Sequence, residues 1–290
     1  MNARSALFDL YGDHLRSRGS QAPVAALVRL LAPLGITEPA ARTAVSRMVR
    51  QGWLAPVRCA PRVPGYALTP RAARRLDEAA ERIYRRGDPA WDGRWHVLVI
   101  ERIRDRVRAA LGYLGYAPLG ETTWISPRPS VELDPLLEAE RLPAERFVAS
   151  YDGDPRGLLA RAWDLDRLGR AYQRWLAHAG ELLATAGPDA PDPAVFALRS
   201  ALVHGWRKFL FTDPGFPAAL LPPAWPGHEA ARLFHAESAR LMPGASRFVD
   251  CCLRTPEPAP AHRVGSGGPG PSPPPARNTW HQGEARRPAR

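Results

Sequence analysis

The sequence predicts an α+β protein in which helix-rich segments precede and follow a central segment of strands and helices. Three observations lead to this fold class. Apolar residues recur at helical spacing through much of residues 3–85 and again through residues 193–253. The run WHVLVI, residues 95–100, has the length and β-branching of a buried strand. Stretches containing Pro and Gly, residues 85–93 and 185–193, separate these regions.

The first 88 residues predict three helices, a hairpin and a further helix. The three helices are expected over residues 3–15, 23–34 and 37–51. Gly35 and Gly52 follow the second and third helices as stop signals. Apolar stretches at 54–58 and 66–69 indicate a two-stranded hairpin, and a last helix is expected over 71–85. This order of elements predicts a winged helix-turn-helix domain.

The helix expected over residues 37–51 has one apolar and one cationic face. Its apolar face carries Ala41, Ala44, Val45, Met48 and Val49. Its other face carries Arg42, Thr43, Ser46, Arg47 and Arg50. Arg can pair with both acceptors of a guanine, and Ser and Thr can reach bases or phosphates, so these five residues are candidates for contact with a DNA major groove. A merely solvated helix is the alternative, and the absence of acidic residues from 39 to 76 argues against it.

Positive charge is concentrated in this first segment. The formal net charge is +11, carried by arginines and the single lysine Lys208, a composition that also fits the codon bias of a GC-rich genome. However, residues 1–88 contain 15 basic and 7 acidic residues, whereas residues 89–255 contain 20 of each. The segregation indicates a polyanionic partner for the first segment. Arg58 and Arg62 on the hairpin are candidates for phosphate or minor-groove contact, unless they only keep the hairpin soluble.

The rest of the chain predicts two further domains and a tail. Strand 95–100, a helix over 101–113, strands at 122–125 and 147–151 and helical sequence over 155–184 indicate a ferredoxin-like α/β sandwich over residues 89–186. Residues 187–255 predict a C-terminal helical domain. Residues 256–290 are rich in Pro, Gly and Ser and poor in aliphatic residues, so we expect a disordered tail.

Other features predict a cytoplasmic protein that has no metal site, no cofactor and no enzymatic activity. The three cysteines, Cys59, Cys251 and Cys252, show no spacing typical of zinc ligands. No apolar run approaches the ~18 residues that span a bilayer, and the first residues lack the pattern of a secretory signal, so we expect no membrane association.

Several stretches follow one another along the chain in a specific order: LFDLYGDHL, LLAPLGITEPAARTAVSRMVRQGWL, GYALTPRA, WDGRW and LVHGWRKFLFTDPGFPAALLPPAWPG. Through them, about residues 4–250 resemble the phenylacetic-acid-degradation repressor (PaaX) family. The resemblance implies a Cas2-like central domain and a dimeric repressor of aromatic-acid catabolism genes, such as a phenylacetate operon. It also implies a double-stranded DNA operator and an acyl-coenzyme A effector such as phenylacetyl-CoA. The hairpin departs from the family, because RCAPRVPGYALT contains prolines where a basic, Gly-Arg-type tip is expected.

Trp206, Arg207 and Lys208 are the candidate effector-binding residues. A cationic pair beside an aromatic ring would suit the phosphates and adenine of coenzyme A. The alternative is a structural helix end in which Arg207 pairs with Asp213.

Two other functions are alternatives to a regulator. The first is a Cas2-like, metal-dependent nuclease, which needs a carboxylate cluster; the candidates Asp92, Asp152 and Asp154 are scattered at the ends of predicted strands. The second is an architectural DNA-binding protein that senses no metabolite, which effector titration would distinguish from a regulator.

Overall fold

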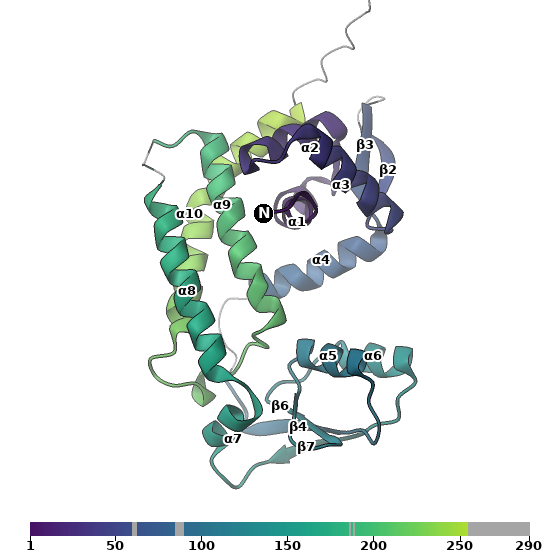
Figure 1. Cartoon of the computed structure of the whole chain (residues 1–290), viewed down its shortest axis with the longest axis vertical. Helices are drawn as coiled ribbons and strands as arrows, with labels where there is room; N and C mark the ends of the chain where they lie inside the picture. The colour runs from purple at the N-terminus through teal and green to yellow at the C-terminus, as the bar shows by residue number, and fades with distance from the viewer. Residues whose placement is uncertain (60–62, 85–89, 186, 188, 255–290) are drawn as a thin grey trace, which may run out of the picture. The chain divides into compact units, whose positions relative to one another are not determined.

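The computed structural model describes residues 1–59, 63–84, 90–185, 187 and 189–254, and Met1–Pro256 form one compact unit (Figure 1). Arg62 and the tail predicted over residues 256–290 lie outside the described residues. Among the described residues, no helix is long and apolar enough to cross a membrane.

The N-terminal helices form where their apolar spacing predicts them. They are α1 (Ala3–Leu10), continued by a π-helical turn (Tyr11–Leu15), then α2 (Val24–Leu31), continued by a 3-10 turn (Ala32–Leu34), and α3 (Glu38–Arg50). Gly35 and Gly52 follow α2 and α3 with φ values of 72° and 71°, which a residue with a side chain rarely adopts. Thr37 occupies the N-cap position of α3, although its side chain makes no capping hydrogen bond there.

The hairpin that follows α3 is part of a three-stranded antiparallel sheet, where the sequence predicted only the hairpin. The hairpin strands are β2 (Leu54–Cys59) and β3 (Val63–Leu68), and a short strand that the sequence did not predict, β1 (Gln21–Pro23), pairs with β3. Gly65 allows this pairing, because a Cβ atom there would lie 2.6 Å from the carbonyl oxygen of Ala22. Helix α4 (Pro70–Ile83) comes next, with Thr69 as its N-cap.

Helices α1, α2 and α3 share a core with helices from the other end of the chain. Fully buried Leu7, Leu30 and Met48 belong to one cluster, and that cluster also contains Phe196 and Val249. Figure 1 shows α2 and α3 close to α1, and α9 runs beside this group. The N-terminal elements are therefore not packed only among themselves.

The middle segment has the β-α-β-β-α-β connectivity predicted for a ferredoxin-like fold. Its elements are β4 (Arg94–Val99), α5 (Asp105–Tyr113), β5 (Ala117–Pro118), β6 (Thr123–Ser126), α6 (Leu133–Glu140) and β7 (Glu145–Ser150). All neighbouring strands are antiparallel, in the order β5-β6-β4-β7, with Leu98 opposite Trp124. Buried Val107 and Leu137 pack α5 and α6 on the face that carries Leu98.

The middle segment differs from the prediction in two ways. The helix predicted from residue 101 begins only at Asp105, because Ile100 still donates a hydrogen bond to the carbonyl of Thr122 and Arg104, the N-cap, has extended backbone. Strand β5 and helix α6 were not predicted. Strand β5 has only 2 residues and α6 only 8, so both are shorter than the window of about 11–18 residues in which periodicity is judged.

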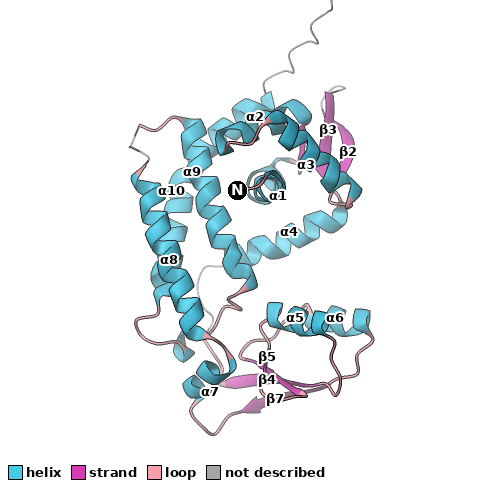
Figure 2. Cartoon of the chain, in the orientation of Figure 1, coloured by secondary structure: helices cyan, strands magenta, loops and turns pink. Residues whose placement is uncertain are grey.

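The remaining chain is helical, as predicted (Figure 2). Its elements are α7 (Pro155–Ala162), α8 (Leu165–Ala184), α9 (Asp192–Trp206), two 3-10 turns (Arg207–Phe211 and Ala218–Leu220) and α10 (Pro226–Arg254). Trp163 is extended and separates α7 from α8, where Asp164 caps the new helix. Aromatic side chains dominate the core here: Tyr172 stacks on Phe209 with ring centroids 4.0 Å apart.

Candidate nucleic-acid interface and the Trp206 pocket

Helix α3 separates its apolar and polar residues as the sequence predicts. Ala41, Ala44, Val45 and Met48 are buried, with at most 6% of their surface exposed. All five polar residues of the opposite face are exposed: Arg42, Thr43, Ser46, Arg47 and Arg50. The structure therefore brings these five candidates together on one accessible helix face, and burial of the other face fixes how that face is turned.

The arginines on this face differ in their pairing. Arg42 forms an ion pair with Glu38, one turn earlier on α3, with an N–O distance of 2.7 Å. Arg47 and Arg50 have no acidic partner among the described residues. The face thus keeps uncompensated positive charge beyond its first turn, as a surface that meets a polyanion requires.

The hairpin contributes one described candidate. Arg58 is exposed on β2, opposite Pro64 on β3, and has no acidic partner in the described part of the chain. Arg62 lies outside the described residues. The neighbouring Cys59 points inward and is 7% exposed, and burial raises the pKa of its thiol. The side chains of β2 therefore turn Arg58 outward and Cys59 inward.

Helix α1 and the turn after it support α3 from behind. Phe8 packs edge-on against Trp53, which follows α3, with ring centroids 4.7 Å apart. The Tyr11 hydroxyl donates a hydrogen bond of 2.8 Å to the carbonyl of Tyr66 on β3. Burial raises the pKa of Tyr11, so this hydroxyl stays protonated and remains a donor. The position of α3 and of the hairpin therefore depends on α1.

A buried acid on α1 pairs with the end of α9, a contact that the sequence did not predict. The carboxylate of Asp9 lies 2.8 Å from Nδ1 of His204 and 2.6 Å from Nε of Arg207. Only 7% of the Asp9 side chain is exposed. The predicted alternative for Arg207 was a pair with Asp213, and it is wrong. Asp213 instead accepts hydrogen bonds from the Tyr172 hydroxyl and from the backbone N–H of Gly215.

A second buried acid, Asp13 in the π-helical turn, contacts polar side chains from α9 and from the end of α4. Arg199 on α9 forms an ion pair with it, and Tyr84 at the end of α4 donates a hydrogen bond to it. Arg199 is 1% exposed and also donates to the carbonyl of Ser238 on α10, at 3.0 Å. His14 is buried beside this group, and burial lowers its pKa to about 4. A sequence pattern has no signal for the partners of Asp13, because Tyr84 lies 71 residues away along the chain and Arg199 lies farther still.

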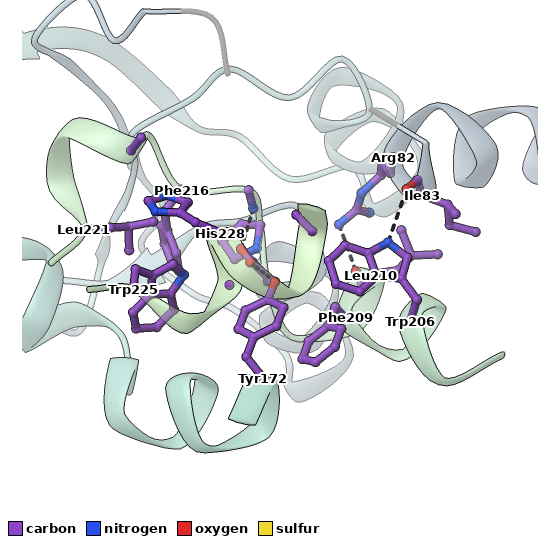
Figure 3. A pocket seen from close by; sticks show the side chains of 16 residues that line it. Arg82, Ile83, Tyr172, Trp206, Phe209, Leu210, Phe216, Leu221, Trp225 and His228 are labelled. Atoms are coloured by element: carbon purple, nitrogen blue, oxygen red, sulfur yellow. Dashed lines mark hydrogen bonds between the residues drawn. The ribbon is translucent and has the colours of Figure 1, made fainter. Parts of the chain in front are cut away.

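A pocket of about 260 Å³, here called the Trp206 pocket, lies beside the end of α9 (Figure 3). Aromatic and apolar side chains form most of its wall, among them Tyr172, Trp206, Phe209, Phe216 and Trp225. Polar residues in the lining are Arg82, Asp213 and His228. The indole N–H of Trp206 donates a hydrogen bond of 3.2 Å to the carbonyl of Ile83. The sequence does not distinguish most of these residues from core residues, because aromatic residues at helical spacing are also typical of a hydrophobic core.

The three residues predicted to bind an effector do not form one site. Trp206 lines the pocket and stacks on Phe234, with ring centroids 4.7 Å apart. Arg207 points toward Asp9, and Lys208 is exposed. The local sequence places the three side by side along the chain, whereas the helical turn directs them to different surroundings.

The carboxylates considered for a nuclease take part in local structure. Asp92 accepts a hydrogen bond of 3.0 Å from the backbone N–H of Arg94, and Asp154 caps α7 through Arg156 and Gly157. Asp152 is exposed. Within the part of the chain that the structure describes, no three His, Cys, Asp or Glu residues are grouped so that they could hold a metal ion.

Comparisons with known proteins match this arrangement along most of the chain. Three family models match in order: "PaaX-like protein" at residues 2–72, "PaaX protein central Cas2-like domain" at 88–157 and "PaaX-like protein C-terminal domain" at 163–251. The transcriptional repressor PaaX of Escherichia coli (strain K12) is 28% identical over 264 residues, which cover 86% of this chain and 83% of the relative. The uncharacterized protein Rv0674 from Mycobacterium tuberculosis has a similar structure, with a TM-score of 0.60 and 27% identity over 87% of this chain and 98% of that one. The chain therefore belongs to the PaaX family of transcriptional repressors.

Proposed function

We propose that residues 1–88 form a winged helix-turn-helix domain that binds an operator in double-stranded DNA, with α3 as the helix that enters the major groove. The exposed face of α3 carries this proposal. It presents Arg42, Thr43, Ser46, Arg47 and Arg50 together, while the opposite face is buried. Arg47 and Arg50 supply charge that no acid in the described residues neutralises, and Ser46 supplies a short hydrogen-bonding group on the same face.

The hairpin has a smaller part in the proposal. Arg58 is exposed and suits a phosphate contact at the edge of the groove, and Arg62 stays a candidate on sequence grounds alone. The prolines of the hairpin argue against a long, flexible wing, so we place most of the base contacts on α3.

We further propose that the protein is a cytoplasmic homodimer which represses an aromatic-acid catabolic operon of the phenylacetate type. An acyl-CoA effector such as phenylacetyl-CoA would relieve repression. The central domain over residues 89–186 and the helical domain over 187–255 would provide dimerisation and sensing, and the tail over 256–290 would add none of these functions. Of the three predicted effector residues, Trp206 and the exposed Lys208 remain available for a ligand, whereas Arg207 is engaged by Asp9.

The experiment measures binding of the full chain to DNA from upstream of its own gene, between 50 and 200 mM salt. We expect affinity to fall steeply with salt, and Arg50→Ala to reduce the slope of log K against log salt by about one. Arg240→Ala is the matched control, because Arg240 is an exposed arginine on α10 that pairs with Glu237. Absence of salt-dependent binding, with and without acyl-CoA compounds, would overturn the proposal.

A further inference from the structure

The last turn of α9 contacts two separate parts of the molecule. His204 and Arg207, three residues apart on one side of the helix, both contact Asp9 on α1. Trp206, between them in sequence, lines the Trp206 pocket (Figure 3). A movement of this one turn therefore acts on the pocket wall and on the Asp9 carboxylate at the same time.

The end of α4 makes the same connection by a second route. Ile83 lines the pocket, and its carbonyl accepts the hydrogen bond from the indole of Trp206. The next residue, Tyr84, donates a hydrogen bond to Asp13, which lies one helical turn beyond Asp9. The last turn of α9 and the end of α4 thus join the pocket wall to two buried acids, Asp9 on α1 and Asp13 in the π-helical turn after it. Helix α1 and this turn are called the α1 region below.

The α1 region in turn sets the position of α3. Helices α1 and α3 pack against each other in one core, with Leu7, Leu10 and Met48 at most 2% exposed. Closely packed protein interiors have low compressibility, so they transmit a displacement from one helix to the next. A change in how Asp9 is held is therefore passed to the helix that carries Arg47.

The lining of the pocket indicates which chemical group it accepts. Its walls are ring faces and edges, of which Tyr172, Trp206 and Trp225 are examples, and aromatic walls of this kind favour a planar aromatic group. A volume of about 260 Å³ falls just below the roughly 300–1,000 Å³ of pockets for whole small molecules, so a ring-sized part of a ligand would fill it. Arg82 and His228 lie in the lining and suit an anionic remainder that extends outward. The one acid among the described residues of the lining, Asp213, already accepts hydrogen bonds from the Tyr172 hydroxyl and the backbone N–H of Gly215.

We infer that the Trp206 pocket binds the aromatic group of an anionic small molecule, and that the last turn of α9 transmits its occupancy to α1 through Asp9. The inference rests on the proposed function, because it assigns the regulation of the same DNA-binding face. Coupling requires that the ligand interact differently with two arrangements of the chain, and Trp206 is the residue that lines the pocket and also belongs to the turn that contacts Asp9.

The ligand site is tested by calorimetry on the full chain, with phenylacetyl-CoA as the probe and acetyl-CoA as its matched control without a ring. We expect phenylacetyl-CoA to bind at least about 10-fold more tightly than acetyl-CoA, in line with burial of one aromatic ring. Ala231→Phe places a ring in the pocket from α10, and we expect it to weaken phenylacetyl-CoA binding by about the same factor. Equal affinity for the two thioesters, or unchanged binding by a folded Ala231→Phe protein, overturns the assignment of the pocket.

The relay is tested by the effect of phenylacetyl-CoA on operator affinity. In the unaltered chain we expect a change of about 10-fold, within the usual range for coupled sites. Asp9→Asn keeps the shape of the side chain but removes its charge, and we expect the change to fall below about 2-fold while phenylacetyl-CoA still binds. His204→Gln gives a second, milder variant that should act in the same direction. Asp192→Asn is the control, because it removes the same charge from an exposed pair with Arg247.

The calorimetry and the operator-binding measurements together distinguish failure of this inference from failure of the proposed function. If the unaltered chain binds no operator, the proposed function fails, and calorimetry still decides whether the pocket takes an aromatic thioester. If operator and phenylacetyl-CoA both bind but Asp9→Asn and His204→Gln respond like the unaltered chain, the relay is wrong. Loss of coupling in Asp192→Asn as well would also overturn it, because the effect would then not depend on Asp9.

Discussion

Arg47 on α3 and Arg199 on α9 show two opposite uses of the same side chain. Arg47 is exposed and has no acidic partner among the described residues. Arg199 is 1% exposed and is held by Asp13, Tyr84 and the carbonyl of Ser238. An exposed charge costs the fold almost nothing and stays available to a partner, whereas a buried one must be compensated inside the protein. The difference teaches that exposed arginines can be changed to test binding, and buried ones to test assembly of the helices.

The largest effect is expected from breaking the buried pair. Arg199→Met leaves the Asp13 carboxylate buried without its cation, and we expect the free energy of unfolding to fall by about 3–5 kcal/mol. Denaturant unfolding of the full chain measures this. The double variant Arg199→Met/Asp13→Leu removes both charges, so it should lose clearly less than Arg199→Met alone. A loss below about 1 kcal/mol for Arg199→Met would mean that the two ends of the chain are not joined by this pair.

A pH dependence is expected from His14, in the same buried cluster. Burial lowers its pKa from 6.5 to about 4, so between these values the unfolded chain binds a proton that the folded chain does not. Stability therefore falls as the pH falls from 6.5 to 4, by at most about 3 kcal/mol. Unfolding curves at several pH values measure the slope. Asp13 and Arg18 are the charged neighbours of His14. The control is His14→Leu, which removes the titrating imidazole but keeps these neighbours and should therefore flatten this part of the profile. An unchanged slope would assign the acid sensitivity to other groups.

The exposed arginine is expected to affect binding and not folding. Arg47→Ala should lower affinity for the specific operator by about 1–3 kcal/mol and relax the preference at one base position. Its free energy of unfolding should stay within about 0.5 kcal/mol of the unaltered chain. Competition binding against operators with single base changes, together with denaturant unfolding, measures both quantities. If Arg47→Ala destabilises the fold as Arg199→Met does, the contrast between exposed and buried arginines is lost.

The smallest effect is expected from the difference between two arginines of α3: Arg42 is paired, whereas Arg47 has no acidic partner in the described part of the chain. Arg42 is partly neutralised by Glu38, so Arg42→Ala should weaken DNA binding less than Arg47→Ala does. Glu38→Gln removes a negative charge near the DNA phosphates, and we expect affinity to rise about 2-fold at low salt and less at high salt. Fluorescence anisotropy with labelled operator is sensitive enough for this change. A lower affinity of Glu38→Gln would show that Glu38 positions Arg42 for binding.

The sequence predicted the parts of the fold that depend on local spacing. The apolar repeat from Ala41 to Met48 fixed which face of α3 is buried, and the run at 95–100 gave strand β4. In the central sandwich the sequence predicted β4, α5, β6 and β7 but missed β5 and α6, and the helical sequence that it assigned to the sandwich after β7 forms α7 and α8. The candidate DNA-binding residues were therefore found together on one face, because one helix carries nearly all of them.

By itself, the sequence determined the α3 face, the segregation of charge toward residues 1–88 and the resemblance to a family. Tertiary structure alone decided what holds that face in place. Asp9 meets His204 and Arg207 across almost 200 residues, and the Trp206 pocket gathers residues from α4, α8, α9 and α10. Local periodicity cannot encode such contacts, because they arise when separate helices bury their apolar faces together and enclose the charges between them.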